Sequence, residues 1–242
     1  CTPCPATLDD ARRSMELSLA WAARSRRRFD ELRDAEPGRG EALFGIVQGG
    51  VDAALRRRSV AAIAALAFDG IAIGGLSVGE TKAQMAATLD VVAEALGDDP
   101  RARYLMGVGS PVDFFTAVER GVDLFDCVLP TRVARNGQLW TGQGRLNLRN
   151  ARFLDDGGPI DPACACEACR NHSRAYLAHL FRADELLAYR LSSVHNVTYT
   201  LDLMRRIRGA LADGSFASLR DVVATQYGSV GTGADKPPIT GR

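Results

Sequence analysis

The stretches "ALFGIVQGG", residues 42–50, and "GIAIGGLSVGE", residues 70–80, decide the fold class of this chain. Each is a short apolar run that ends in glycines, and the segment between them, residues 51–68, has the apolar spacing of a helix. Two similar runs follow at 103–110 and 122–132, again separated by helical sequence. Short buried strands that alternate with helices predict parallel β-α-β units.

The carboxyl ends of parallel strands lie on one face of such a fold, where its active site is built. We therefore expect Gln48, Gly75, Gly109 and Asp126 to converge, although they are far apart in the sequence. A (β/α)8 TIM barrel is the first choice of fold, and a doubly wound sheet is the alternative. A barrel needs eight units, and four are recognisable before residue 130. We expect its amino-terminal strands to be absent from this chain.

The remaining segments predict a helix, a hairpin and a helical end. Residues 7–32 read as a long helix capped by Thr7, with the triplet Arg26–Arg28 on a solvated face. Residues 136–150 resemble a hairpin, and the last helix is expected from about Asn196 to Leu211. The predicted division is a barrel part at 1–135, a hairpin and zinc-binding subdomain inserted at 136–195, terminal helices at 196–226 and a disordered tail at 227–242.

Composition limits the class of protein. The chain has 242 residues, 46% of them hydrophobic, and a net charge of +1, so it is not a polycation. No apolar run approaches the roughly 20 residues of a membrane span, which predicts a soluble, cytoplasmic protein without a membrane partner. Of the 30 basic residues only Lys82 and Lys236 are lysines. This bias fits a GC-rich genome, and clustered arginines would also suit phosphates and base edges.

The sequence "CACEAC", residues 164–169, predicts a metal site. Its closely spaced cysteines cannot easily form unstrained disulfides, but three thiolates can reach one zinc ion. A fourth ligand could come from His172, His179 or His195. We favour His195, because Ser192 or Ser193 could cap the last helix there and a ligand would pin that helix to the cysteine loop. Four protein ligands leave no open position, so one structural zinc ion is expected.

Asp126 is the candidate for catalysis. Strand alternation puts it on the same face as Val122, Leu124 and Val128, where a charge is costly unless it is hydrogen-bonded or used in chemistry. It could be a nucleophile at the barrel mouth, or a buried carboxylate satisfied by backbone amides. The nearby guanidinium groups of residues 132 and 135 fit an anionic substrate such as a phosphate backbone, and an internal salt bridge is equally compatible with them.

Taken together, these motifs resemble the bacterial type of tRNA-guanine transglycosylase, also called queuine tRNA-ribosyltransferase. The resemblance rests on "FGIVQGG", "FDGIAIGGLSVGE", "RYLMGVG", "DLFDCVLPTR", "NGQL" and "CACEAC…VHN", and runs in order from Cys1 to about residue 212. It implies a (β/α)8 barrel with a zinc subdomain. It also implies a pentosyltransferase of queuosine biosynthesis that exchanges the wobble guanine of certain tRNAs for 7-aminomethyl-7-deazaguanine through a covalent Asp–ribose intermediate.

The resemblance also implies a role for individual residues. Asp126 matches the nucleophile, and Val78 matches the bacterial version of the family. The base pocket corresponds to Cys1, Gln48, Gly75, Leu76 and Met106. The RNA-contacting segments correspond to Gly107, Val108, Gly109, Ser110, Pro111, Val112, Asp113, Thr131, Arg132, Val133, Ala134 and Arg135. The zinc ligands correspond to Cys164, Cys166, Cys169 and His195.

The partners implied by the resemblance are tRNA with guanine at the wobble position, a 7-deazaguanine base and a second copy of the chain. The family's general acid/base Asp and its purine-reading Asp belong to sequence before Cys1, so this chain by itself is expected to be inactive. Three alternatives remain at this point. They are a non-catalytic zinc-containing tRNA-binding accessory subunit, a relative acting on DNA or another tRNA position, and a phosphate-binding metabolic barrel.

Overall fold

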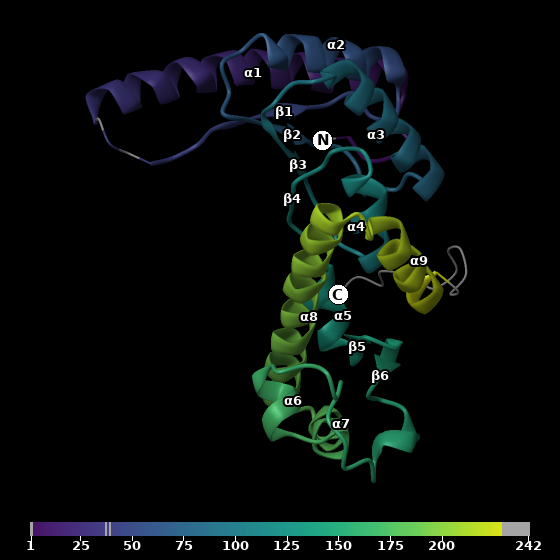
Figure 1. The fold of residues 1–242 in the computed structure, drawn as a ribbon. Helices are drawn as coiled ribbons and strands as arrows, with labels where there is room; N and C mark the ends of the chain where they lie inside the picture. Colours follow the sequence, from purple (N-terminus) through teal and green to yellow (C-terminus); the bar gives the residue numbers. More distant parts are fainter. Residues whose placement is uncertain (1, 37, 39, 229–242) are drawn as a thin grey trace. The chain divides into compact units, whose positions relative to one another are not determined.

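The computed structural model describes residues 2–36, 38 and 40–228 (Figure 1). These residues form two compact units, one made of the described residues up to Gly109 with Asp113–Cys127, the other of Ser110–Val112 with the described residues from Val128 onward. Each unit is described by itself. Cys1 and residues 229–242 lie outside the described residues, as does most of the tail predicted to be disordered. Within the described part, no helix is long and apolar enough to cross a membrane.

The first unit contains a four-stranded parallel sheet, which confirms the predicted strand–helix alternation. Its strands are β1 (Phe44–Val47), β2 (Gly70–Ile73), β3 (Ala102–Leu105) and β4 (Leu124–Phe125), in the order β1-β2-β3-β4. The register places Ile46 beside Ala72, Ala72 beside Tyr104, and Tyr104 beside Leu124. Side chains at paired positions of parallel strands share a face of the sheet, so this register decides which residues can meet.

Four helices accompany the sheet: α1 (Leu8–Ala35), α2 (Ala53–Ala64), α3 (Lys82–Leu96) and α4 (Pro111–Val118). Their starts follow from local capping. The Thr7 hydroxyl accepts a hydrogen bond from the Asp10 amide, as predicted, and Asp52 caps α2 in the same way. Thr81 and Gln84 form a reciprocal capping box at the start of α3.

The two faces of the sheet differ in burial. Val47, Ile73 and Leu105 point into a core formed with apolar side chains of α2, α3 and α4. On the opposite face, Ile46 and Leu124 are 37% and 46% exposed among the described residues. The helices therefore cover one face, and the other carries apolar side chains that face open space in this part of the chain.

One prediction for α1 was wrong. Arg27 and Arg28 are exposed, but Arg26 is buried. Its guanidinium forms an ion pair with Asp30 and donates to the carbonyl oxygen of Ala67 at 2.9 Å. The side chain therefore fastens α1 to the segment before β2. A run of three arginines does not reveal which one faces the protein, because that depends on where the neighbouring segment passes.

The second unit begins with α5 (Leu129–Arg135) and the predicted antiparallel hairpin of β5 (Gln138–Thr141) and β6 (Gly144–Asn147). Short elements follow: the 3-10 helix η1 (Ala151–Phe153), α6 (Glu167–Asn171) and α7 (Arg174–Arg182). The long helix α8 (Leu186–Asp213) and α9 (Phe216–Tyr227) complete it. A core of its own links the hairpin, the cysteine loop, α7 and α8.

Helix α8 begins ten residues before the predicted start. Glu185 stands at its N-cap, so Ser192 and Ser193 lie inside the helix and neither caps it. His195 is accordingly an interior residue of α8, and it is fully buried. The physical reason is that "LLAYRLSS" packs as a continuous helix against the second core, and no residue in it breaks the helix.

Candidate functional site

The carboxylate of Asp126 lies directly after β4, at the carboxyl edge of the parallel sheet. Its Oδ1 accepts two hydrogen bonds, from the Tyr104 hydroxyl at 2.6 Å and from the Gly107 amide at 2.9 Å. No donor among the described residues reaches Oδ2. One carboxylate oxygen is therefore held, and the other is open to a ligand.

The alternative in which Asp126 is a buried carboxylate is contradicted by the exposure of this residue. Asp126 is exposed, as are Leu124 and Val128, and only Val122 of that set is buried. Leu124 and Asp126 are on the sheet face that the helices leave uncovered, whereas Val122 packs in the first core. The Asp126 carboxylate therefore keeps contact with solvent in this part of the chain.

Tyr104 holds Asp126 as a neutral hydrogen-bond donor. The hydrogen bond to Asp126 raises the pKa of Tyr104 to about 12, and burial adds to the effect. The phenol is therefore protonated at neutral pH. Its ring meets the Phe44 ring edge-on, with centroids 6.2 Å apart, which packs the side chain from the β1 side. Neither residue was among the sequence-predicted site residues.

Gln48 and Gly75, two residues of the predicted base pocket, lie against each other at the ends of β1 and β2. A Cβ atom added to Gly75 would stand 2.6 Å from the Gln48 Oε1, and Gly75 has a φ of +68°. Only glycine meets both conditions without strain. Leu76 differs from its neighbours, because its side chain is buried in the first core and only its backbone can face a ligand.

The side chain of Arg56 in α2 binds the backbone at the ends of both β1 and β2. The side chain is fully buried, and its guanidinium donates to the carbonyl oxygens of Gly50 at 2.7 Å, Gly74 at 2.8 Å and Val47 at 3.2 Å. Burial lowers the pKa of Arg56 to about 10, partly countered by the charge of Glu80, so the group is still charged at neutral pH. Sequence reasoning missed Arg56, since "LRRRS" looks like an exposed run.

A cavity of about 280 Å3 opens beside these strand ends. Gly49, Gly50, Gly75 and Val78 line it together with residues from the start of the chain, among them Cys4. The amide of Cys4 donates to the Val78 carbonyl oxygen at 3.2 Å, which joins the start of the chain to the loop after β2. The Glu80 carboxylate accepts from the Val78 amide at 2.9 Å and holds the same loop.

The segments predicted to contact RNA contain both exposed and buried side chains. In the first segment, Gly107 is exposed, whereas Val108 belongs to the first core and Asp113 is buried in an ion pair with Lys82 at 2.5 Å. Gly109 is buried, Pro111 is buried, and Ser110 and Val112 are half-buried. Met106, predicted for the base pocket, is also half-buried.

In the second segment, α5 divides its side chains between solvent and the second core. Arg132 and Arg135 are exposed and three residues apart, so they lie on one side of the helix. Ala134 is buried in the core of that unit, and Thr131 and Val133 are half-buried. The two guanidinium groups are the side chains of α5 that can reach an anion.

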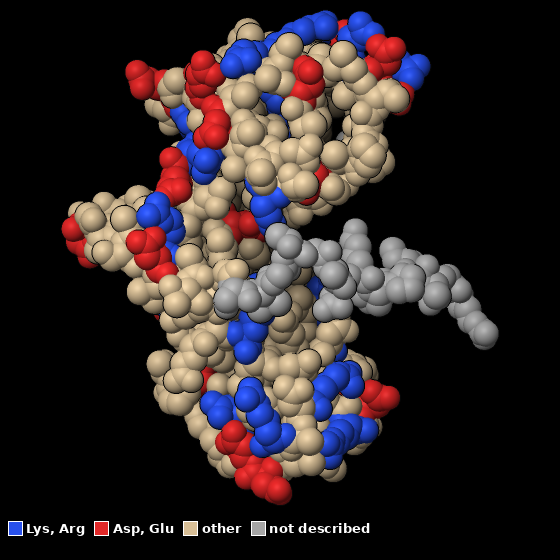
Figure 2. Space-filling model, turned by 90° about the vertical axis from the view of Figure 1, so that its right-hand side faces the viewer, with Lys and Arg blue, Asp and Glu red and all other residues tan. Residues whose placement is uncertain are grey.

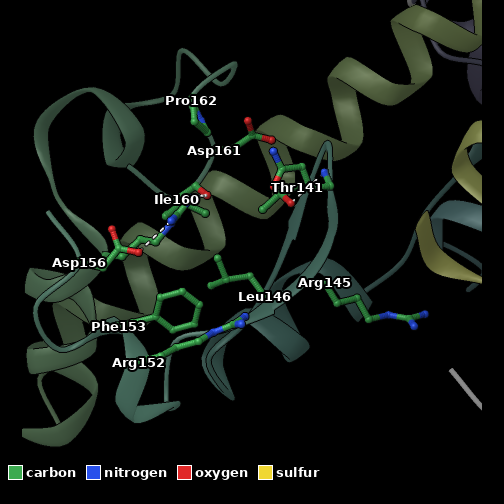
Figure 3. Close-up of a pocket in the computed structure, with 11 residues that line it drawn as sticks. Thr141, Arg145, Leu146, Arg152, Phe153, Asp156, Ile160, Asp161 and Pro162 are labelled. Carbon is green, nitrogen blue, oxygen red and sulfur yellow. Dashed lines mark hydrogen bonds and ion pairs between the residues drawn. The ribbon is translucent and has the colours of Figure 1, made fainter. Parts of the chain in front are cut away.

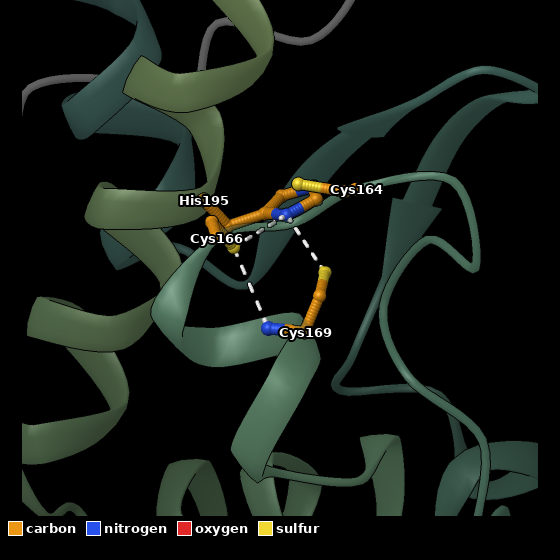
Figure 4. A group of neighbouring side chains, drawn as sticks. All are labelled: Cys164, Cys166, Cys169 and His195. Atoms are coloured by element: carbon orange, nitrogen blue, oxygen red, sulfur yellow. Dashed lines mark hydrogen bonds between the residues drawn. The ribbon is translucent and has the colours of Figure 1, made fainter.

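The sulfur atoms of Cys164, Cys166 and Cys169 gather around His195 (Figure 4). The four ligand atoms all lie within 4.8 Å of one another. Zinc–sulfur bonds of about 2.3 Å in a tetrahedron put ligand atoms roughly 3.8 Å apart, so the cluster has the size and the donor set that zinc requires. Three of the four residues are buried, which suits a closed structural site.

The three buried side chains of this cluster have shifted pKa values. The hydrogen bond from the Cys169 thiol lowers the pKa of Cys166 to about 3, and donating that bond raises the pKa of Cys169. Burial lowers the pKa of His195, but the thiols of Cys164 and Cys166 outweigh it and raise it to about 9. Zinc binds thiolates and a neutral imidazole, so metal binding would release the protons that these groups hold.

The second unit also has a cavity of about 370 Å3, between the hairpin, η1 and the loop before the cysteines (Figure 3). Arg174 pairs there with Asp156 at 2.9 Å, and its guanidinium and that of Arg152 lie over the Phe153 ring. Figure 2 shows basic side chains close together on the face of this unit that carries the hairpin. None of the sequence-predicted site residues lines this cavity.

The model of the queuine tRNA-ribosyltransferase family matches residues 1–229. The chain belongs to this family.

Curated proteins named queuine tRNA-ribosyltransferase agree with the family match. The protein of Acidithiobacillus ferrooxidans is 54% identical over 221 residues, which are 91% of this chain and 57% of that protein. That of Thioalkalivibrio sulfidiphilus is 53% identical over 94% of this chain and 58% of its own length. That of Shewanella frigidimarina is 49% identical over 94% and 59%. The chain thus spans somewhat less than three fifths of the relatives it matches.

Membership of the queuine tRNA-ribosyltransferase family agrees with the metal prediction. Cys164, Cys166, Cys169 and His195 form a metal site of the kind that zinc occupies, as predicted. The choice of His195 over the other two histidines is also confirmed, because neither His172 nor His179 belongs to the cluster. The reason given for that choice, a helix cap at the preceding serines, was wrong.

Proposed function

We propose that the full-length protein that carries this chain is a tRNA-guanine transglycosylase, a pentosyltransferase of queuosine biosynthesis. It would exchange the guanine at the wobble position of its tRNA substrates for 7-aminomethyl-7-deazaguanine. The single observation that carries the proposal is the Asp126 carboxylate, which stands at the carboxyl edge of a parallel sheet with one oxygen held and one open. The names of the relatives support the substrate class.

The chemistry that fits this carboxylate is a double displacement at the ribose. Asp126 attacks C1′ on the face opposite the base, the C1′–N9 bond breaks with its electron pair going to the purine, and an Asp–ribose ester forms. The departing purine takes up one proton and the incoming base gives up its N9 proton, both by exchange with solvent or with an acid/base group of the full-length protein. The N9 of the incoming base then attacks C1′. The C1′–Oδ bond breaks and its electron pair returns to the carboxylate. Two inversions retain the configuration of the nucleoside.

The base pocket that we propose lies at the ends of β1 and β2. A base must leave its stack to react, and its edges are then read by hydrogen bonds. The Gln48 amide and the backbone around Gly75 lie together there, beside a cavity that Gly75 and Val78 line. Leu76 would contribute through its backbone and Met106 through its half-buried side chain. The place of Cys1 in this pocket stays a prediction.

The tRNA contacts that we propose come from the exposed members of the two predicted segments. Arg132 and Arg135 would hold phosphates, because guanidinium groups match phosphate oxygens in bidentate geometry. Gly107 and its neighbours would approach the RNA backbone at the sheet edge. Val108 and Ala134 would act only through their main chain, since their side chains are buried.

A (β/α)8 barrel is the fold that we propose for the whole catalytic domain. Four neighbouring parallel strands with helices over one face support it. So does the uncovered face, because Ile46 and Leu124 would be packed in the interior of a closed barrel. The domain limits at residues 135, 195 and 226, the homodimer and the cytoplasmic location stay predictions.

Trapping of a covalent intermediate tests the function. The full-length protein is mixed with wobble-guanine tRNA and free guanine, and a denaturation-resistant protein–RNA adduct is sought on a gel. We expect an adduct that Asp126→Asn abolishes and Asp123→Asn leaves intact, since the Asp123 carboxylate accepts the Arg103 amide at the amino end of β4. An Asp126→Asn protein that still exchanges bases at the normal rate would refute the proposal.

A further inference from the structure

Two donors converge on one oxygen of Asp126, and the geometry is asymmetric. The Tyr104 hydroxyl and the Gly107 amide both reach Oδ1, at 2.6 and 2.9 Å. No donor in the described part of the chain reaches Oδ2. A carboxylate has two chemically equal oxygens, and this arrangement makes them unequal before any substrate binds.

The two donors are themselves fixed by the fold. Tyr104 pairs in register with Leu124, two residues before Asp126, so its side chain is on the same face of the sheet as the carboxylate. The edge-on contact with Phe44 limits the movement of its ring. Gly107 has a φ of +74°, a conformation that glycine adopts without strain, and this turn aims its amide at Asp126.

We infer that Tyr104 and the Gly107 amide are positioning groups that reserve Oδ2 of Asp126 as the attacking oxygen and make the carboxylate the better leaving group in the second displacement. The inference rests on the proposed function. It concerns which of the two chemical steps these donors assist, and thus goes beyond naming the nucleophile.

The electronic argument gives the direction of the effect. When Oδ2 bonds to C1′, Oδ1 becomes the carbonyl oxygen of an ester and loses most of its negative charge. Hydrogen bonds to charged acceptors are about twice as strong as those to neutral ones. The Tyr104 and Gly107 donors therefore stabilise the free carboxylate more than the ester. They favour breaking of the C1′–Oδ2 bond, with its electron pair returning to the carboxylate, over its formation.

Tyr104 can fill this role over the working pH range. Its hydrogen bond to Asp126 raises the pKa of the phenol to about 12, so the proton stays on the tyrosine. The group is a fixed donor and does not serve as the acid or base of the reaction. The contribution of Tyr104 to the rate of the second displacement should therefore vary with the strength of the donor and not with pH near neutrality.

The experiment measures the two displacements separately in the full-length protein. Ester formation is followed by rapid mixing with wobble-guanine tRNA, and the isolated adduct is then chased with 7-aminomethyl-7-deazaguanine. For Tyr104→Phe we expect the chase to slow by roughly 10-fold to 100-fold, formation to keep its rate or become faster, and adduct to accumulate in the steady state. Tyr189→Phe is the matched control, because its hydroxyl makes only a 3.4 Å contact with Asp184.

A second variant separates this role from a merely structural one. Replacing Tyr104 by 3-fluorotyrosine keeps the shape and strengthens the phenol as a donor. The chase rate should then rise in the order phenylalanine, tyrosine, fluorotyrosine. The inference would be overturned if Tyr104→Phe slowed ester formation and the chase equally. It would also be overturned if the chase rate did not change with the strength of the donor. A wild-type protein that forms no adduct would instead refute the proposed function.

Discussion

The Nε2 of His195 lies 2.8 Å from the carbonyl oxygen of Trp140, and this contact decides which ring nitrogen faces the sulfurs. With Nε2–H donating to β5, Nδ1 is left to the metal, and it stands 3.3 Å from the Cys169 sulfur. The next residue repeats the link, because the Asn196 side chain accepts from the Trp140 amide at 3.0 Å. Helix α8, the hairpin and the cysteine loop thus meet at one point, and outer contacts of this kind orient metal ligands.

Loss of a zinc ligand should unfold the second unit. Structural zinc contributes about 10–16 kcal/mol in small zinc domains, which is comparable to the whole stability of a domain. We expect Cys166→Ser to lower bound zinc from one ion to almost none per chain, measured by elemental analysis, with loss of helical circular dichroism. His179→Ala, which alters an exposed histidine outside the cluster, should keep its zinc. Full zinc content in Cys166→Ser would contradict the assigned ligand set.

Arg56→Met should destabilise the first unit by about 3 kcal/mol, measured by urea unfolding. The change keeps the length of the side chain but leaves the carbonyl oxygens of Gly50 and Gly74 without the donor that reaches them at 2.7 and 2.8 Å. The neighbouring Arg57→Met is the control, because Arg57 makes an exposed pair with Glu94. We expect that control to change stability by less than about 0.5 kcal/mol. Equal effects of the two substitutions would show that burial of Arg56 is unimportant.

Gly75→Ala should lower the free energy of unfolding, measured with urea, by more than the backbone conformation of Gly75 alone would cost. Gly75 and Gly214 have similar positive φ values, +68° and +78°, but an added Cβ would meet the Gln48 Oε1 at 2.6 Å at Gly75 and no atom within 4 Å at Gly214. Gly214→Ala thus measures the cost of the left-handed conformation, about 1 kcal/mol. The excess cost in Gly75→Ala should shrink in a Gln48→Ala background. An excess that persists there would mean that the Gln48 contact is not its cause.

The pKa of Tyr104 should lie well above that of an exposed tyrosine. Because the folded pKa is raised from 10 to about 12, the contact with Asp126 stabilises the fold fully below pH 10, and this contribution is lost as pH rises through 12. Ultraviolet titration of the wild type minus Tyr104→Phe should isolate one phenol with a midpoint near 12. A difference titration centred at 10 would show that the hydrogen bond is absent in solution.

Arg132 and Arg135 should act through phosphates. In the full-length protein, each change to alanine should weaken tRNA binding and reduce the slope of log affinity against log salt by about 1. Arg190→Ala, which removes an exposed partner of Glu167, should leave the slope unchanged. Weaker binding with an unaltered salt slope would point to a contact with bases and not with the backbone.

Local signals in the sequence were enough to predict the secondary-structure elements and the metal site. Apolar runs that end in glycine predicted the four parallel strands, and the spacing of Cys164, Cys166 and Cys169 predicted a metal clamp. These signals succeed because strand length, helix periodicity and ligand spacing are properties of a few neighbouring residues. The same reasoning placed Gln48 beside Gly75, since parallel strands end on one edge.

Only the tertiary structure decided which polar groups are buried and which oxygen of Asp126 is held. Arg26 and Arg56 cannot be told from their exposed neighbours in the sequence. They are buried because backbone carbonyl groups of distant loops lie within hydrogen-bonding distance of their guanidinium groups. Tyr104 meets Asp126 across 22 residues because of strand register, and His195 reaches the thiols from the middle of a helix that begins earlier than predicted. Such contacts depend on packing between segments distant in the chain, about which local sequence patterns carry no information.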